Sequence, residues 1–257
     1  MKKYSLDLVV STNIELGNNH FLLKFTHTEP LPEMLPGQFV QVRVDNAPGV
    51  FLRRPISVNY VDRINNELWL LVQKVGEGTK KMAEYKTGDV VNMLLPLGNS
   101  FSMPHSAQSR LLLVGGGVGI APLLYMGANL KRQGYQPDFL LGARSAVGLM
   151  QIDDFKQFGN VYITTEDGSA GEKGFVTQHS ILQDPIDKIY TCGPTPMMQA
   201  VARFAQINSI DCEASLENKM ACGFGACLCC VTQTQTGHKC VCSEGPVFNT
   251  KELSWQI

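Results

Sequence analysis

The chain has 257 residues, of which 44% are hydrophobic and 18% charged, a balance typical of a globular protein. Its formal net charge of −1 excludes the strongly basic surface that nucleic acids or anionic membranes require. The length predicts two compact domains with room for a small third region.

The N-terminus and the longest apolar run both argue against export or membrane insertion. Residues 1–10 alternate like a strand, and Asp7 interrupts their apolar pattern, so we expect no signal peptide. The apolar run over residues 111–124 contains four glycines and is too short to span a bilayer. We therefore expect a cytoplasmic protein, in whose reducing surroundings cysteines favour metal binding over disulfides.

Short β-rich runs recur through residues 1–102 and predict a small antiparallel β-barrel domain. Turn-forming Gly, Pro, Asn and Asp residues separate the runs. One short helix is expected, over Gly78–Tyr85. The predicted strands are Tyr4–Ser11, His20–Thr26, Gln38–Val44, Ile56–Val61, Glu67–Lys74 and Asp89–Leu95.

Two features of this barrel suit phosphate binding. In Arg54-Pro55-Ile56-Ser57, a guanidinium and a hydroxyl at the start of a strand can bind the oxygens of one phosphate. Gly76-Glu77-Gly78-Thr79 opens the predicted helix, where free backbone N–H groups attract anions. Taken singly, a surface arginine and an ordinary turn explain each feature. Together they predict a pyrophosphate site and therefore a flavin.

Residues 103–212 change to alternating strands and helices and predict an α/β nucleotide-binding domain. A buried strand, Arg110–Val114, runs directly into the glycine-rich turn Gly115–Pro122 and a helix over Leu123–Arg132, an arrangement that can hold phosphate. The glycine spacing differs from G-x-G-x-x-G, and a plain tight turn is the alternative. Later strands are predicted at Asp138–Arg144, Asn160–Thr165 and Lys188–Pro194, and Thr195 is the predicted cap of the following helix.

Ligands of open α/β sheets bind beyond the carboxyl ends of the strands. The segments Gly115–Pro122, Gly142–Ser145 and Cys192–Pro194 all lie at such ends, so we expect them to face one nucleotide. Arg144 would favour a 2′-phosphate and Glu166 with Asp167 a free ribose hydroxyl, so the choice between NAD and NADP stays open.

Six of the eight cysteines lie in the last predicted region, residues 213–257. Cys222, Cys227 and Cys230 have the C-x4-C-x2-C spacing of a plant-type [2Fe–2S] site, and Cys242 supplies a fourth thiolate. Zinc, which more often uses two C-x2-C pairs, and a disulfide knot are the alternatives. Cys229 and Cys240 are two further cysteines beside the predicted ligands.

A flavin barrel followed by a nicotinamide-nucleotide domain resembles the ferredoxin–NADP⁺ reductase superfamily. Arg54–Ser57 resembles its flavin motif, and Gly115–Pro122 and Cys192–Pro194 resemble its two nucleotide motifs. The cysteine loop, closed by Cys242-Ser243-Glu244-Gly245-Pro246-Val247-Phe248, is similar to that of electron-transfer subunits of type B dihydroorotate dehydrogenase. Phe51–Ser57, and Thr165–Ser169 with Lys173–Thr177, also look like that family.

This resemblance implies an oxidoreductase subunit of de novo pyrimidine (UMP) biosynthesis with FAD, a [2Fe–2S] cluster and NAD. The cluster would be held by Cys222, Cys227, Cys230 and Cys242. FAD would be lined by Arg54, Pro55, Ile56, Ser57, Leu71, Val72, Gln73, Gly78 and Thr79. NAD would be bound by Gly115, Gly116, Gly117, Gly119, Ala121, Pro122, Cys192, Gly193 and Pro194.

The implied partner is an FMN-containing catalytic subunit that oxidises dihydroorotate, in a heterotetramer with two copies of each subunit. Electrons would pass from that FMN through the cluster and FAD to NAD⁺, and this chain needs no acid–base residue of its own for orotate formation. One alternative is a flavin and iron–sulfur subunit of an NADH-dependent ferredoxin–NADP⁺ reductase, sulfite reductase or hydrogenase. Another is a zinc-stabilised interaction module without enzyme activity.

Overall fold

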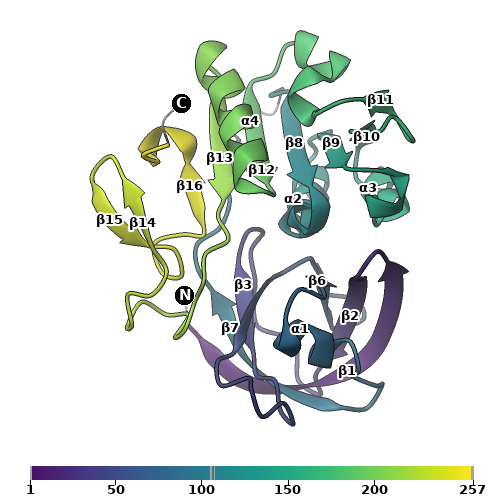
Figure 1. Cartoon of the computed structure of the whole chain (residues 1–257), viewed down its shortest axis with the longest axis vertical. Helices are drawn as coiled ribbons and strands as arrows, with labels where there is room; N and C mark the ends of the chain where they lie inside the picture. Colours follow the sequence, from purple (N-terminus) through teal and green to yellow (C-terminus); the bar gives the residue numbers. More distant parts are fainter. Residues whose placement is uncertain (1, 105, 107, 256–257) are drawn as a thin grey trace.

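The computed structural model describes residues 2–104, 106 and 108–255. Figure 1 shows a curled sheet at one end, an α/β layer at the other, and a C-terminal region alongside both. No helix in the described part of the chain is both long and apolar enough to span a bilayer.

The N-terminal sheet is antiparallel and curls into a half-barrel, which confirms the predicted class of this part. Its strands lie in the order β4-β3-β7-β1-β2-β6-β5. The short helix α1 (Glu77–Met82) lies against it. The strands are β1 (Tyr4–Gly17), β2 (His20–Thr26), β3 (Phe39–Val42), β4 (Arg54–Ser57), β5 (Tyr60–Asp62), β6 (Glu67–Gln73) and β7 (Val90–Leu97).

The strand at His20–Thr26 is confirmed residue for residue, but the single strand predicted at Ile56–Val61 is wrong. Strand β4 ends at Ser57, and β5 begins at Tyr60. Asn59 breaks the strand because its side chain is fully buried and donates to the carbonyl of Ala121 at 3.0 Å. The helix predicted at Gly78–Tyr85 is shorter than expected and starts one residue earlier.

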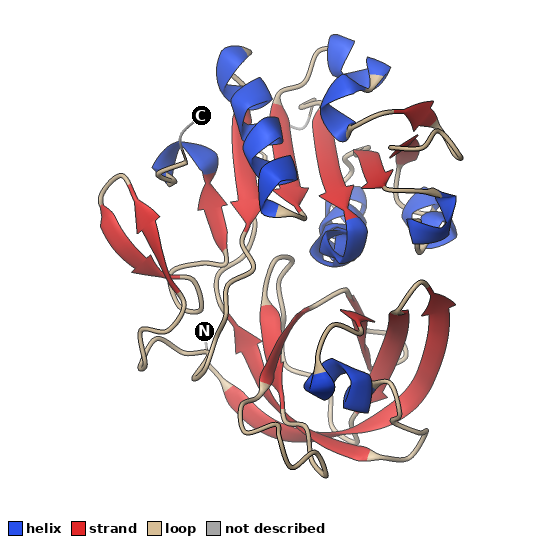
Figure 2. Ribbon diagram, in the orientation of Figure 1, coloured by secondary structure: helices blue, strands red, loops and turns tan. Residues whose placement is uncertain are grey.

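The second sheet is covered by helices on both faces, as the prediction of an α/β domain requires (Figure 2). Its strands lie in the order β11-β10-β9-β8-β12-β13-β16, all parallel except the last pair. They are β8 (Leu111–Gly116), β9 (Asp138–Ala143), β10 (Asn160–Thr165), β11 (Glu172–Lys173), β12 (Lys188–Cys192), β13 (Asp211–Ser215) and β16 (Val247–Asn249).

Alternate residues of β8 pack on opposite faces of this sheet. Leu111 and Leu113 contact the hydrophobic core under α2 (Ala121–Arg132) and α3 (Ile152–Lys156). Leu112 and Val114 lie in the core under α4 (Thr195–Ile207). Thr195 is not the cap of α4 as predicted but its first residue, because Pro194 already has the extended backbone of a cap (φ −54°, ψ 137°).

The C-terminal region holds a two-stranded ribbon, β14 (Val231–Thr234) and β15 (Gly237–Cys240). Short 3-10 turns lie at Gly117–Ile120, Ala146–Gly148, Val176–Gln178, Ser180–Gln183 and Thr250–Glu252. The boundary predicted between residues 212 and 213 falls inside β13, and β16 returns from the C-terminal region to pair with β13. The domain limits therefore stay predictions, and one sheet edge is shared across that boundary.

Candidate functional site

Backbone N–H groups are directed at the sulfur of each of the four predicted cluster ligands. The Cys227 sulfur accepts from the N–H of Cys222 at 3.5 Å, and the Cys222 sulfur accepts from that of Ala226 at 3.3 Å. The Cys242 sulfur accepts from Gly225 at 3.1 Å, and the Cys230 sulfur accepts from Cys242 at 3.3 Å. Such donors stabilise thiolate, which is the form that binds metal.

The two additional cysteines lie outside this set of contacts. The Cys229 thiol is exposed and donates to the carbonyl of Lys219 at 3.8 Å. Cys240 is buried in the hydrophobic core of the C-terminal region. The contacts therefore separate four cysteines from two in the way that the spacing predicted, although the ligand set itself stays a prediction.

Two of these contacts link the four cysteines in pairs, since the N–H of Cys222 donates to the Cys227 sulfur and the N–H of Cys242 donates to the Cys230 sulfur. Within the described ranges of the chain, no three His, Cys, Asp or Glu side chains converge on one metal-ion position. In a [2Fe–2S] cluster each tetrahedral iron takes two thiolates beside its two bridging sulfides, so two pairs match the donors that the cluster needs.

The backbone of the loop turns where the sequence has glycine. Gly223 and Gly225 have φ values of 78° and 93°, which few residues other than glycine adopt easily. Burial acts to raise the pKa of Cys222, but the backbone N–H groups of Phe224, Cys227 and Ala226 outweigh it and lower that pKa to about 6. Cys242, by contrast, has its pKa raised to about 12, first by burial and then by the neighbouring Cys230 thiol.

In the predicted flavin site, Arg54 of β4 lies over the start of α1. A Cβ on Gly78 would come within 2.5 Å of the Arg54 Nε, so the absence of a side chain at Gly78 makes room for the guanidinium. Arg53 is used differently, because it donates to the carbonyls of Gln41 and Asn92 inside the half-barrel. The Arg54 guanidinium donates instead to the carbonyl of the exposed Leu52 at 2.6 Å, and the residues present fit a flavin pyrophosphate.

The side chains of the other predicted flavin residues point in different directions. Leu71 packs toward the α/β domain, whereas Val72 lies in the core of the half-barrel, so only its backbone is available to a ligand. The Thr79 hydroxyl accepts from the N–H groups of Val75 and Gly76 and therefore closes its own turn. Pro55, Ile56 and Ser57 lie on β4, which pairs with β3.

The two glycine motifs of the predicted nucleotide site meet backbone to backbone. A Cβ on Gly119 would lie 2.4 Å from the Cα of Gly193, and a Cβ on Gly116 would lie 2.5 Å from the sulfur of Met197. Gly117 has a φ of 56°. Both turns follow parallel strands, β8 and β12, at the edge where nucleotides bind in such sheets.

Cys192 is fully buried, and burial raises the pKa of its thiol well above the ordinary value. It is the last residue of β12 in the α/β sheet. Ala121 and Pro122 are buried in the first turn of α2, whereas Pro194 is exposed. After the end of β10, the Asp167 carboxylate accepts two hydrogen bonds from Ser169, and these bonds lower the pKa of Asp167.

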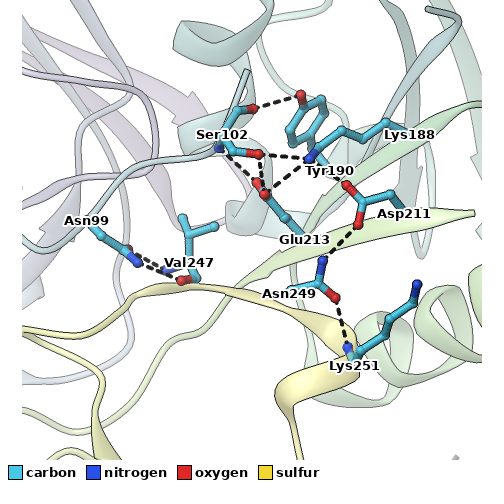
Figure 3. Close-up of polar contacts among 9 residues, drawn as sticks. All are labelled: Asn99, Ser102, Lys188, Tyr190, Asp211, Glu213, Val247, Asn249 and Lys251. Carbon is cyan, nitrogen blue, oxygen red and sulfur yellow. Dashed lines mark hydrogen bonds and ion pairs between the residues drawn. The ribbon is translucent and has the colours of Figure 1, made fainter. Parts of the chain in front are cut away.

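A network of charged and polar groups joins the three regions, and local sequence gave no signal for it (Figure 3). The buried Lys188 ammonium contacts Asp211 at 2.7 Å and Glu213 at 3.2 Å and donates to the hydroxyl of Ser102 at 2.8 Å. Ser102 follows the half-barrel, and its carbonyl accepts from the Tyr190 hydroxyl. The network fixes the segment after the half-barrel on strands β12 and β13 of the α/β sheet.

Asn99 fixes the chain that follows Cys242 in the same way (Figure 3). Its side-chain amide donates to the carbonyls of Glu244 and Val247 and accepts from the N–H of Val247. The partners are 145 and 148 residues apart in the sequence, which explains why no local pattern predicted them. The fourth predicted cluster ligand is thereby held against the half-barrel.

Two protein-family models match the chain. The iron–sulfur cluster binding domain of dihydroorotate dehydrogenase B matches residues 217–254, a range that contains all four predicted cluster ligands. The oxidoreductase NAD-binding domain matches residues 113–203, a range that contains both glycine motifs.

Full-length relatives agree with these models. The electron transfer subunit of dihydroorotate dehydrogenase B (NAD⁺) of Shouchella clausii (strain KSM-K16) is 40% identical, with 98% of each chain covered. The same subunit of Fusobacterium nucleatum subsp. nucleatum is 35% identical, with 96% of this chain and 97% of the relative covered. A solved NADH-dependent reduced ferredoxin–NADP oxidoreductase is 29% identical with a TM-score of 0.87, over 96% of this chain and 90% of that one. Phthalate dioxygenase reductase, 22% identical with a TM-score of 0.65 over 84% and 70% of the two chains, shares the fold.

Proposed function

The chain belongs to the family of electron transfer subunits of dihydroorotate dehydrogenase B, and we propose that it connects bound NAD to a catalytic subunit through FAD and a [2Fe–2S] cluster. It is an oxidoreductase subunit of pyrimidine biosynthesis, with an NAD-binding domain and an iron–sulfur cluster binding domain. The orotate-forming step belongs to the partner.

The observation that carries the proposal is the set of N–H contacts to Cys222, Cys227, Cys230 and Cys242. These four residues would hold the cluster, and the backbone of their loop would supply the donors that thiolates need. The side chains of Phe224 and Leu228 in the same loop are 48% and 65% exposed. An exposed apolar loop around a redox centre suits a protein partner, so we place the catalytic subunit over this loop.

On the half-barrel, Arg54, whose guanidinium lies in the space left by the missing side chain of Gly78, would bind the pyrophosphate of FAD. When bound, a flavin supplies the junction between two-electron exchange with a nicotinamide and one-electron exchange with a cluster. The turns at Gly115–Pro122 and Cys192–Pro194 would hold the dinucleotide against the α/β sheet. A complex of two copies of each subunit, located in the cytoplasm, completes the proposal.

The purified chain tests this directly by its absorbance spectrum and by iron and flavin analysis. We expect two irons and one FAD per chain, NADH-dependent reduction of an artificial dye, and no oxidation of dihydroorotate without the partner. Orotate formation by the chain alone would refute the assignment. A colourless protein with one zinc would instead support the interaction module.

The match to the NADH-dependent reduced ferredoxin–NADP oxidoreductase favours one second candidate, a subunit of an enzyme of that kind. The two candidates differ in their partner. Co-purification with an FMN-containing subunit, and dihydroorotate-dependent reduction of NAD⁺ by the pair, would decide for dihydroorotate dehydrogenase. Ferredoxin-dependent reduction of NADP⁺ would decide for the alternative.

A further inference from the structure

Gln41 is a buried polar residue whose side chain has no hydrogen-bond partner among the described residues. It lies in β3 of the half-barrel with an exposed fraction of 0%, and neither its Nε2 nor its Oε1 makes a hydrogen bond. Buried amide groups in native proteins are almost always paired, so an unpaired one calls for an explanation.

The Gln41 side chain points out of the half-barrel and toward the cysteine loop. In β3, Val40 and Val42 pack into the core of the half-barrel, whereas Phe39 packs in the core of the C-terminal region. Because side chains alternate along a strand, Gln41 faces the same way as Phe39. In Figure 1, β3 lies beside the C-terminal region.

Gly223 marks the point of contact between Gln41 and the loop. A Cβ on Gly223 would lie 2.6 Å from the Gln41 Cγ and 2.8 Å from its Nε2. Glycine is thus required here for two independent reasons, the φ of 78° and the presence of the amide. The unpaired amide of Gln41 therefore lies against the residue that follows Cys222.

We propose that the Gln41 side-chain N–H donates a hydrogen bond to a sulfur of the [2Fe–2S] cluster and thereby raises the reduction potential of that cluster. This inference rests on the proposed function, because it requires the cluster. Hydrogen bonds to cluster sulfurs stabilise the reduced state, which carries one more negative charge. The other donors come from the loop itself, whereas Gln41 comes from the half-barrel. The predicted flavin domain would thus tune the cluster that it exchanges electrons with.

The test compares Gln41→Met with the wild-type chain in a redox titration monitored by electron paramagnetic resonance. Methionine fills a similar volume but cannot donate an N–H. We expect iron content and visible spectrum to be retained, and the ratio of reduced to oxidised cluster at a fixed potential to fall about tenfold. For one electron, this corresponds to a shift of about 59 mV to more negative values. The matched control is Gln233→Met, an exposed position on β14 of the same region, for which we expect no shift.

A second variant, Gln41→Glu, keeps the inference testable if Gln41→Met does not fold. Gln41→Glu keeps the shape of the side chain, removes the donor and adds a negative charge when ionised, so its potential should also be more negative than that of wild type. Enrichment of glutamine side chains with ¹⁵N adds a direct readout: a hyperfine coupling to the reduced cluster in wild type that Gln41→Met lacks.

Two failures are distinguishable. An iron-free wild-type chain would overturn the proposed function. The inference alone would be overturned if a folded variant keeps its cluster and the ratio of reduced to oxidised cluster at a fixed potential changes less than twofold. That result would indicate that the amide binds water or fills space.

Discussion

Replacing Lys188 with Met should destabilise the chain strongly, because it leaves two acidic groups without their shared cation. The Lys188 side chain is 5% exposed, and those of Glu213 and Asp211 are 10% and 37% exposed. At an effective dielectric constant of about 20, each contact contributes on the order of 5 kcal/mol of gross attraction, most of which desolvation offsets. Removing one partner of a buried pair costs about 3–5 kcal/mol.

The exposure of Asp211 places the expected loss at the lower end of that range, about 3 kcal/mol. For a chain of this size, such a loss lowers the midpoint of thermal unfolding by about 6–12 °C. Differential scanning fluorimetry or a urea titration at pH 7 measures it. Lys251→Met is the matched control, because Lys251 is exposed near the same network, and it should change stability by less than about 0.5 kcal/mol.

The pH dependence supplies an independent check. Burial acts to raise the pKa of Asp211, but hydrogen bonds from Lys188 and Asn249 outweigh it and lower that pKa below 3.8. A carboxylate with a lowered pKa stabilises the fold above its unfolded pKa of about 3.9, and this contribution is lost as the pH falls through the lower, folded value. The difference in the free energy of unfolding between wild type and Lys188→Met should therefore become smaller below about pH 4. A destabilisation under about 1 kcal/mol at pH 7, or a difference independent of pH, would refute the reasoning.

Three further predictions concern the proposed sites. Gly119→Ala places a Cβ 2.4 Å from the Cα of Gly193, so the two backbone segments must separate. We expect a higher KM for NADH and a loss of stability of about 1–3 kcal/mol. An unchanged KM would contradict the role of this contact in nucleotide binding. Arg54→Gln should weaken FAD binding by about 1.5–3 kcal/mol, roughly 10- to 150-fold, as measured by flavin retention on dilution; full retention would argue against the phosphate role. Cys229→Ser should keep the cluster spectrum, whereas Cys227→Ser should lose it; loss in the former would show that the ligand register is misassigned.

Local sequence was sufficient wherever the structure depends on neighbours in the chain. Strands such as His20–Thr26 and Asn160–Thr165 follow from β-rich composition bounded by turns, and both have the predicted limits. The spacing of the cysteine loop likewise separated Cys229 from the residues whose sulfurs accept N–H bonds. In each case the information lies in one short stretch of the chain, so a single sequence is enough.

Local sequence failed wherever a distant partner decides the conformation. Asn59 interrupts a β-rich run because its amide donates to the Ala121 carbonyl, 62 residues away. Lys188 gave no sign of its role, since its acidic partners lie on the next strand of the sheet and Ser102 lies 86 residues back. Such contacts form only when the regions have packed together, and therefore no local pattern in the sequence predicts them.

Strand β3 shows how tightly the regions are combined. A strand of a half-barrel normally buries one face and exposes the other, yet all four residues of Phe39–Val42 are buried. Val40 and Val42 stabilise the half-barrel, while Phe39 contributes to the core that contains Cys230 and Cys242. The C-terminal region therefore depends on the half-barrel for part of its hydrophobic core. Because packing on both faces holds this strand, apolar contacts fix the cysteine loop relative to the predicted flavin domain, as electron transfer between the proposed FAD and cluster would require.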